Sequence, residues 1–334
     1  MTANSEPLDA HEESYAGVGL TFCRVPFARG PEDLAGSDVA VVGAPFDLGT
    51  SFRPGTRFGP RAIRSAEDVG GPSARPHLEL GLDPFAHLRV VDIGDAPVGP
   101  TISACHAGLY RAVGEILRAG AVPIVLGGDH SLSLPVMRAL SDHLGPDGYS
   151  VIHFDTHADT AIYESGVTTE HAAPFSRAVN EGYVRGTNLI QIGLRGAWPF
   201  PAEFDWMRDN GIRWHSMDQV EERGLTAIVD EVIAAAGTRP RTYLTVDIDV
   251  LDPAFAPGTG TPEPGGLSTR ELLRAVRRIG AALDLCAMDV VEVSPPYDPS
   301  RITALAAHRV VLEALSAIAL RRSGRQPRPE RPSG

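Results

Sequence analysis

Eight residues near the middle of the chain carry three groups that could bind a metal ion. Segment 153–160 reads HFDTHADT, in which Asp155, His157 and Asp159 stand at alternate positions. It directly follows GYSVI, an apolar run with the composition of a β-strand. A polar loop after a strand is the ordinary interpretation, and half of a metal site is the chemical one. The rest of the sequence has to decide between them.

Three further segments place acids or imidazoles where an apolar run ends. Asp129 and His130 follow VPIVLGG, Asp247 and Asp249 follow TYLTV, and Glu292 lies near the end of CAMDVVEV. In an open parallel sheet, ligands bind at the carboxyl ends of the strands. We therefore expect these strand ends and the end that carries Asp155 to converge on one crevice.

The apolar runs alternate with helical patterns, which is typical of an α/β fold. The expected strands occupy residues 38–46, 88–95, 121–130, 149–157, 188–196, 211–218, 241–250 and 285–295. The expected helices occupy residues 103–119, 132–144, 200–210, 221–236, 268–281 and 303–322. Ser268 and Glu271 predict a capping box. We predict one three-layer α/β/α domain over residues 15–322 with an eight-stranded, mostly parallel sheet, and disordered tails at 1–14 and 323–334.

Bulk composition excludes several classes of protein. The 334 residues carry a net charge of −12, and all 30 basic residues are arginine, which rules out a catalytic or phosphate-binding lysine. We find no basic cluster outside the C-terminal tail and no apolar run near the ~20 residues of a membrane span. Three separated cysteines and a polar, acidic N-terminal segment are typical of a reduced compartment. We expect a cytoplasmic protein that binds neither nucleic acid nor membrane.

Six of the strand-end residues could together bind a pair of metal ions. They are His130, Asp155, His157, Asp159, Asp247 and Asp249. Four carboxylates in one crevice repel one another, and two divalent cations would neutralise them. Oxygen and imidazole ligands without thiolate suit Mn²⁺, with Ni²⁺, Fe²⁺, Co²⁺ or Zn²⁺ as alternatives. A pair of ions roughly 3.5–4 Å apart lowers the pKa of a shared water toward ~7 and makes it a nucleophile.

This combination resembles the ureohydrolase family, which contains arginase, agmatinase and related guanidino-compound hydrolases. The resemblance spans residues 35–320. It rests on GAPFDLGTSFRPGTRFGPRAIR (43–64), GGDHS (127–131), HFDTHAD (153–159), VDIDVLDPAFAPGTGTPEPGG (246–266) and DVVEVSPPYD (289–298). It implies a parallel eight-stranded sheet, two Mn²⁺ ions per subunit, a cationic guanidino substrate cleaved to urea and an amine, and a trimeric or hexameric homo-oligomer.

The resemblance also implies a role for each site residue. One ion would be held by His130, Asp155, Asp159 and Asp247, and the other by His157, Asp155, Asp247 and Asp249. Glu292 resembles the family's guanidinium-binding glutamate and His171 its proton-shuttle histidine, with a surface carboxylate and an ordinary loop histidine as the alternatives. We predict that His171, Glu292 and Asp159 act in catalysis. His153 shares the strand face of Asp155, and we expect a buried, hydrogen-bonded neighbour there rather than a ligand.

Segment 160–175 bears on the substrate. Arginases typically have a Ser-Gly-Asn segment here, and this resemblance ends at Ser165-Gly166 because Val167 follows. Arginine is therefore a poor first candidate. Agmatine is the first candidate, and 4-guanidinobutyrate, 3-guanidinopropionate, a proclavaminate-type compound and free guanidine are the alternatives. Three departures leave the substrate open: Thr156 replaces the family's alanine, and Ala172 and Ala173 replace glycine and threonine.

Two functions from other classes are alternatives. A binuclear metallophosphoesterase also uses Asp and His ligands, but it requires further ligands and a phosphate-binding group. A non-catalytic partner subunit would keep the fold without the reaction. The complete ligand set, together with His171 and Glu292, argues against that second alternative.

Overall fold

The computed structural model describes residues 20–66, 76–162, 171–197 and 199–324, and its centre is a single sheet. The strands are β1 (Val39–Gly43), β2 (Val90–Asp95), β3 (Val122–Leu126), β4 (Tyr149–Phe154), β5 (Leu189–Leu194), β6 (Arg213–Ser216), β7 (Arg241–Asp247) and β8 (Leu285–Val291). Their order is β2-β1-β3-β8-β7-β4-β5-β6, and every neighbouring pair is parallel. The predicted eight-stranded sheet is confirmed.

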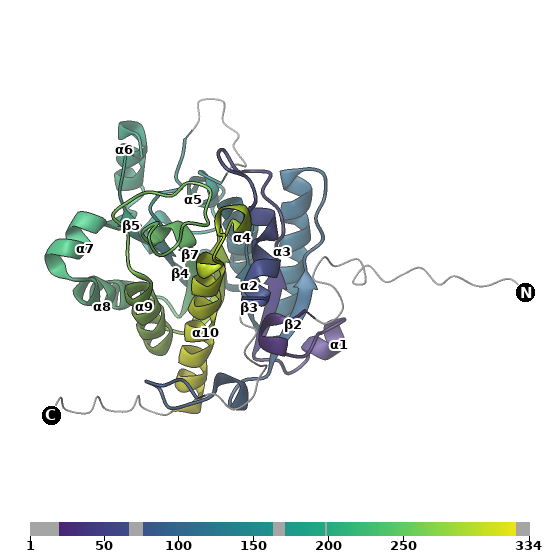
Figure 1. The fold of residues 1–334 in the computed structure, drawn as a ribbon. Coiled ribbons are helices and arrows are strands. Elements are labelled where there is room, and N and C mark those ends of the chain that lie inside the picture. Colours follow the sequence, from purple (N-terminus) through teal and green to yellow (C-terminus); the bar gives the residue numbers. More distant parts are fainter. Residues whose placement is uncertain (1–19, 67–75, 163–170, 198, 325–334) are drawn as a thin grey trace, which may run out of the picture.

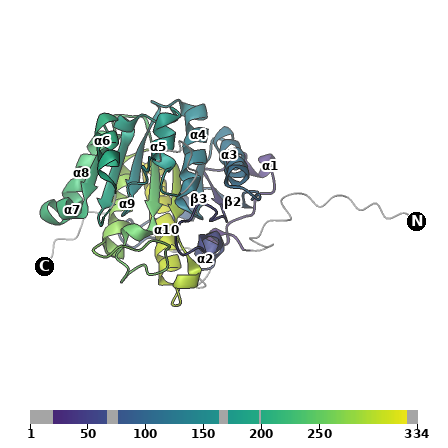
Figure 2. The same ribbon diagram turned by 90° about the horizontal axis from the view of Figure 1, so that it is seen from above.

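Helices cover both faces of this sheet (Figures 1 and 2). One face carries α1 (Pro31–Leu34), α3 (Ile102–Arg118), α4 (Ser133–Leu144), α5 (Pro174–Asn180) and α6 (Pro201–Asp209). The other carries α2 (Gly59–Arg64), α7 (Met217–Arg223), α8 (Leu225–Ala236), α9 (Thr269–Ala282) and α10 (Ile302–Ser323). The three-layer arrangement predicted from the sequence is therefore present.

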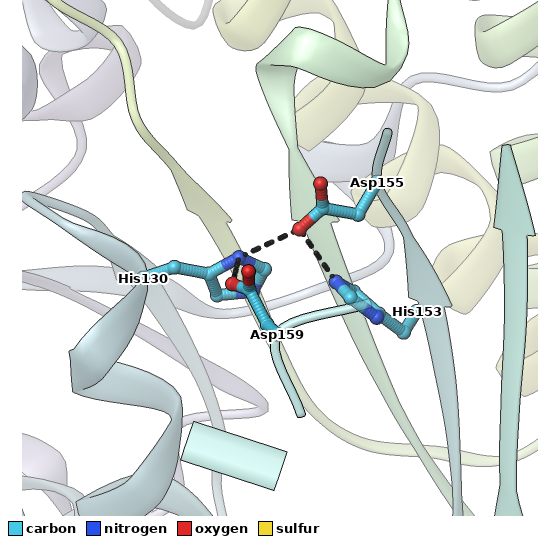
Figure 3. Close-up of side chains that lie close together, drawn as sticks. All are labelled: His130, His153, Asp155 and Asp159. Carbon is cyan, nitrogen blue, oxygen red and sulfur yellow. Dashed lines mark hydrogen bonds and ion pairs between the residues drawn. The ribbon is translucent and has the colours of Figure 1, made fainter. Parts of the chain in front are cut away.

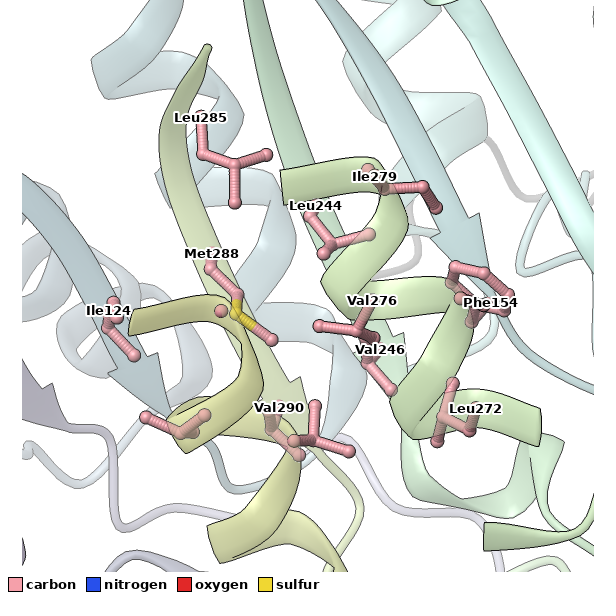
Figure 4. Close-up of a cluster of buried hydrophobic side chains, with 14 of the residues drawn as sticks. Ile124, Phe154, Leu244, Val246, Leu272, Val276, Ile279, Leu285, Met288 and Val290 are labelled. Atoms are coloured by element: carbon pink, nitrogen blue, oxygen red, sulfur yellow. The ribbon is translucent and has the colours of Figure 1, made fainter. Parts of the chain in front are cut away.

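Helix α9 shows how the local sequence builds this architecture. Ser268 caps its first turn by accepting a hydrogen bond from the Glu271 amide, and the Glu271 carboxylate accepts one from the Ser268 amide. The predicted capping box is confirmed. Apolar residues three or four positions apart, Leu272, Val276 and Ile279, then face the sheet and pack into the cluster shown in Figure 4. Burying each such side chain stabilises the fold by about 1.5–3 kcal/mol.

The short helices α1 and α2 were not predicted, and two further parts of the chain differ from the sequence expectation. The helix expected at 221–236 is interrupted at Gly224, whose φ of +79° lies in the left-handed region, so α7 ends there and α8 begins. Helix α5 was not predicted. It has only seven residues and starts at Pro174, directly after the loop that carries His171, so its apolar period is too short to identify.

Helix α10 qualifies the expectation that no segment could cross a membrane. Among the described residues it is the one helix long and apolar enough to do so, but 78% of its most apolar stretch is buried. It packs against α9, α2 and β8, and a core helix is apolar all round for that reason. The predicted tails at 1–14 and 323–334 lie outside the described residues, except for Ser323 and Gly324 at the end of α10.

Candidate metal centre

The four strand ends singled out in the sequence belong to four adjacent strands in the middle of the sheet, in the order β3-β8-β7-β4. His130 lies four residues beyond β3, Glu292 follows β8, Asp247 ends β7, and Asp155 follows β4. Parallel strands end at one edge of a sheet, so these side chains meet there. The expected convergence is present.

His130 is the centre of the first group of candidate ligands. Its Nδ1 atom lies 3.0 Å from Asp155 Oδ2, 3.0 Å from Asp159 Oδ2 and 3.2 Å from Asp247 Oδ2. This nitrogen is buried and makes no hydrogen bond in the described part of the chain. Burial lowers the pKa of His130, but the three carboxylates outweigh burial and raise it well above its ordinary value. The geometry therefore calls for a cation at this position.

His157 and Asp249 form the second group, on the solvent side. His157 Nδ1 lies 3.2 Å from Asp249 Oδ2 and 3.4 Å from Asp155 Oδ1, and the His157 side chain is 23% exposed. Asp155 thus presents Oδ2 to His130 and Oδ1 to His157, and its carboxylate lies between the two groups. That is the position required of a bridging ligand.

The carboxylates of the site repel one another. Burial and then the Asp249 and Asp155 charges raise the pKa of Asp247 well above its ordinary value. Burial and then the Asp155 charge raise the pKa of Asp249 to about 6. Asp159 is held in the left-handed region at a φ of +51°, a strained conformation for a residue other than glycine. Buried carboxylates that repel one another, together with imidazoles, are a donor set that fits divalent transition-metal ions.

His153 is the hydrogen-bonded neighbour that the sequence predicts. Its Nε2 lies 2.8 Å from Asp155 Oδ2, and the two side chains face each other across the site in Figure 3. Its Nδ1 accepts a hydrogen bond of 2.9 Å from Gln191 Nε2. Both ring nitrogens are occupied, whereas His130 keeps Nδ1 open, so the geometry favours His130 over His153 as a ligand.

Glu292 lies beside the metal-binding groups with one carboxylate oxygen committed and one open. Oε1 accepts a hydrogen bond of 2.9 Å from the His130 amide and lies 3.0 Å from His171 Nδ1. Oε2 is buried without a hydrogen-bond partner among the described residues. The residue has a φ of +62°, so its orientation is maintained at a cost in backbone strain. Oε2 is therefore available to a cationic group.

His171 can change its protonation state in place. Burial lowers its pKa, but the Glu292 carboxylate, helped by Asp159 and Asp129, outweighs burial and raises the pKa of His171 to about 9. Its Nε2 lies 2.8 Å from Ser51 Oγ and 3.2 Å from the Ser51 amide. The amide suits only the neutral ring, whereas the hydroxyl can donate to the neutral ring or accept from the charged one. The Ser51 hydroxyl can thus serve either form of His171, whereas the Ser51 amide serves only the neutral ring.

Ser51 and Asp129 were not assigned a role from the sequence. Asp129 is fully buried and accepts hydrogen bonds from the Gly49 amide at 2.8 Å and the Ser131 amide at 3.0 Å. It thereby fixes the Gly49–Ser51 loop against the turn that carries His130. Asp129 was identified as a strand-end acid without a role, and the one available signal for Ser51 was the segment 43–64, which carries part of the family resemblance.

The three departures from the family pattern leave this geometry intact. Ala172 has no positive φ, so its backbone does not require glycine, and its carbonyl accepts a hydrogen bond of 2.9 Å from the Ala161 amide. Ala173 is buried and is the residue that precedes α5, with a φ of −133° and a ψ of 12°. Thr156 is fully buried and donates its amide to Asp249 Oδ1 at 3.3 Å. Its hydroxyl has no hydrogen-bond partner among the described residues.

Known proteins resemble this chain in both sequence and fold. The model of the arginase family matches residues 37–317. Guanidinobutyrase of Pseudomonas aeruginosa is 39% identical over 94% of this chain and 96% of its own length, and an agmatinase of Chromobacterium violaceum is 39% identical over 91% and 89%. The solved structure of proclavaminate amidino hydrolase from Streptomyces clavuligerus superimposes with a TM-score of 0.82 at 38% identity, covering 90% of this chain and 97% of that one. The chain therefore belongs to the arginase family, and it is a hydrolase.

Proposed function

We propose that this protein hydrolyses a linear guanidino compound to urea and an amine at a centre of two divalent metal ions. One observation carries the proposal. The ends of β3, β4 and β7 bring four carboxylates and two imidazoles together, with three of the carboxylates within 3.2 Å of the buried His130 Nδ1, and the end of β8 adds the open Glu292 oxygen. A cation-binding centre and a cation-binding anchor side by side suit the hydrolysis of a guanidinium.

The two groups of ligands would each hold one ion, with Asp155 and Asp247 shared. His130 and Asp159 complete the first set, and His157 and Asp249 complete the second. When bound, the ions supply Lewis acidity that brings the pKa of water from 15.7 toward ~7, within reach of neutral pH. Mn²⁺ is the first candidate and Ni²⁺ the second, because the donors are oxygen and imidazole without thiolate.

The remaining residues bind the substrate and manage its protons. Glu292 Oε2 would accept hydrogen bonds from the planar guanidinium and orient its carbon, since a buried carboxylate binds a guanidinium by charge-assisted hydrogen bonds. The departing amine needs a proton, and His171 holds one at neutral pH because its pKa is raised to about 9. Ser51, hydrogen-bonded to Nε2, keeps the ring oriented in both of its states.

Agmatine is the first candidate substrate on electrostatic grounds. The centre is rich in carboxylates, and the chain as a whole carries a net charge of −12. A second positive charge on the substrate would be favoured there. Guanidino acids are the second candidate, because guanidinobutyrase of P. aeruginosa is as similar to this chain as the agmatinase is, at 39% identity.

The test is urea release from agmatine, arginine, 4-guanidinobutyrate, 3-guanidinopropionate and guanidine, with Mn²⁺ and Ni²⁺ compared. We expect urea from agmatine or a guanidino acid and none from arginine. A parallel assay with para-nitrophenyl phosphate examines the phosphoesterase alternative. Phosphate release without urea would overturn the proposal, and binding of less than one metal ion per chain would favour a non-catalytic subunit.

A further inference from the structure

A row of four polar side chains crosses the sheet one layer below the candidate metal centre. Asp289 of β8 is in register with Thr245 of β7, Thr245 with His153 of β4, and His153 with Gln191 of β5. We call these four residues the polar row. All four are fully buried. They lie on the sheet face that α3, α4 and α5 cover, where Tyr243 and Val151 precede them on β7 and β4.

Such a row needs an explanation. Central strands of a parallel sheet are buried on both faces and are ordinarily continuous runs of apolar residues. A buried polar group destabilises the fold unless it finds a hydrogen-bond partner, and a buried carboxylate does so more strongly. Four polar residues in register across four adjacent strands therefore indicate hydrogen bonds that apolar residues could not supply.

Two members of the row form hydrogen bonds with residues of the metal centre. Thr245 Oγ1 lies 3.0 Å from His130 Nε2, and His153 Nε2 lies 2.8 Å from Asp155 Oδ2. His130 and Asp155 face each other above the row, with 3.0 Å between Nδ1 and Oδ2. Both belong to the ligand set proposed for the first ion.

The two ends of the row determine the direction of these hydrogen bonds. At one end, the Asp289 carboxylate can only accept, and Ser133 Oγ donates to it at 2.9 Å. Ser133 is in turn 3.5 Å from Thr245 Oγ1, which leaves Thr245 able to accept from His130 Nε2. His130 then carries its proton on Nε2, and Nδ1 keeps its lone pair for an ion.

At the other end, Gln191 sets the tautomer of His153. Its amide nitrogen contacts the Ala158 carbonyl at 2.6 Å, which fixes the orientation of the amide group. The same nitrogen donates to His153 Nδ1 at 2.9 Å, so His153 carries its proton on Nε2 and donates it to Asp155 Oδ2. One end thus frees a lone pair, and the other end orients a carboxylate.

The second group of ligands has no such support. Among the described residues, the His157 ring and the Asp249 carboxylate contact Asp155, Thr156, Thr261 and each other, and neither side chain contacts the polar row. His157 is also partly exposed, whereas His130 is fully buried. The row therefore distinguishes one half of the centre from the other.

We infer that the polar row is a positioning layer that sets the affinity of the first metal ion, which it supports through both His130 and Asp155, and affects the second ion less, through the shared Asp155 alone. The inference rests on the proposed function, because it requires two ions. Its residues do not touch the ions. They act through the tautomer of His130 and the orientation of Asp155, which is how neighbours of metal ligands ordinarily tune affinity.

The test measures Mn²⁺ bound per chain by equilibrium dialysis of the purified protein against graded Mn²⁺ concentrations. Thr245→Val removes the hydroxyl at nearly constant shape, Thr245→Ser restores it, and Gln191→Leu acts at the opposite end of the row. We expect Thr245→Val to bind one ion about 10–100-fold more weakly and the other within about twofold of wild type. Gln191→Leu should weaken the binding of that same ion most and of the other ion less, because Asp155 is shared, and Thr245→Ser should behave like wild type.

Tyr149→Phe is the matched control. It removes a buried hydroxyl from β4 that bonds to the Met137 and Tyr183 carbonyls, away from the centre. The positioning layer is refuted if Tyr149→Phe weakens the binding of one ion as strongly as Thr245→Val does. It is also refuted if Thr245→Val and Gln191→Leu leave the affinity for both ions unchanged. If the wild-type protein itself binds fewer than two ions, the proposed function fails first, so the two failures are distinguishable.

Discussion

At the residue scale, the chemistry of this site depends on which atoms are left without a partner. Glu292 Oε2 and His130 Nδ1 are both buried and both without a hydrogen bond among the described residues. One is an anion suited to a guanidinium, and the other is a nitrogen that faces three carboxylates and suits a metal ion. Two neighbouring buried atoms that suit positively charged partners distinguish this edge of the sheet from an ordinary polar loop.

Replacing Glu292 with glutamine tests the anchor. The amide keeps the shape of the side chain but removes the charge, and losing one partner of a buried charge pair typically costs 2–5 kcal/mol, which corresponds to a decrease in kcat/KM of at least about 30-fold. Because Glu292 is the main group that raises the pKa of His171, the alkaline limb of the pH profile also moves to lower pH. Metal content serves as the control and stays at the wild-type value. Unchanged kcat/KM would exclude Glu292 as the anchor.

His171 gives the metal-free protein a specific pH dependence of stability. Its pKa is raised from 6.5 to about 9, so its contribution is fully present below pH 6.5 and is lost as the pH rises through 9. We expect His171→Asn to lower the free energy of unfolding, measured by urea denaturation, clearly at pH 6 and much less at pH 10. The loss at pH 6 should exceed the loss at pH 10 by on the order of 1–3 kcal/mol. An equal loss at both pH values would show that the ring is not charged in the folded state.

At the element scale, α9 offers a stability change that leaves the chemistry untouched. Ser268→Ala removes the side chain that accepts from the Glu271 amide at the start of the helix. The expected loss of unfolding free energy is about 1 kcal/mol, typical of an N-cap, with kcat and KM unchanged. Thermal melting and the urea-release assay check both parts. A change in kcat would mean that α9 communicates with the site.

The elements also show how far the sequence could predict this molecule. Strands with continuous apolar runs, such as 241–250 and 285–295, could be located because burial on both faces leaves a clear pattern, and their polar ends identified the site. The contacts of Ser51 with His171 and of Thr245 with His130 could not be predicted, because each joins residues more than 100 positions apart. The break at Gly224 was missed, since one glycine inside an apolar period is compatible with a continuous helix.

At the scale of the whole molecule, the metal ions should stabilise the fold by relieving the repulsion among the site's carboxylates. Asp247 and Asp249 both have raised pKa values because burial and neighbouring carboxylates disfavour their charged forms. At an Mn²⁺ concentration of 100 Kd, linkage stabilises the folded state by about 2.7 kcal/mol per site. Removing the ions with a chelator should therefore lower Tm by roughly 3–5 °C per site lost. Scanning calorimetry with and without the chelator checks this, and an unchanged Tm would contradict it.

The central claim is that Asp155, His157 and their partners at the ends of β3, β8, β7 and β4 form a metal centre that hydrolyses guanidino compounds. Urea released by the Mn²⁺-loaded protein, compared with a His157→Ala variant, tests it most directly. We predict urea from agmatine or a guanidino acid with the wild-type protein, and a loss of at least about 10²-fold with the variant, because outright removal of a ligand exceeds the effect of changing its neighbours. No urea from any of these substrates, or full activity in the variant, would contradict the account.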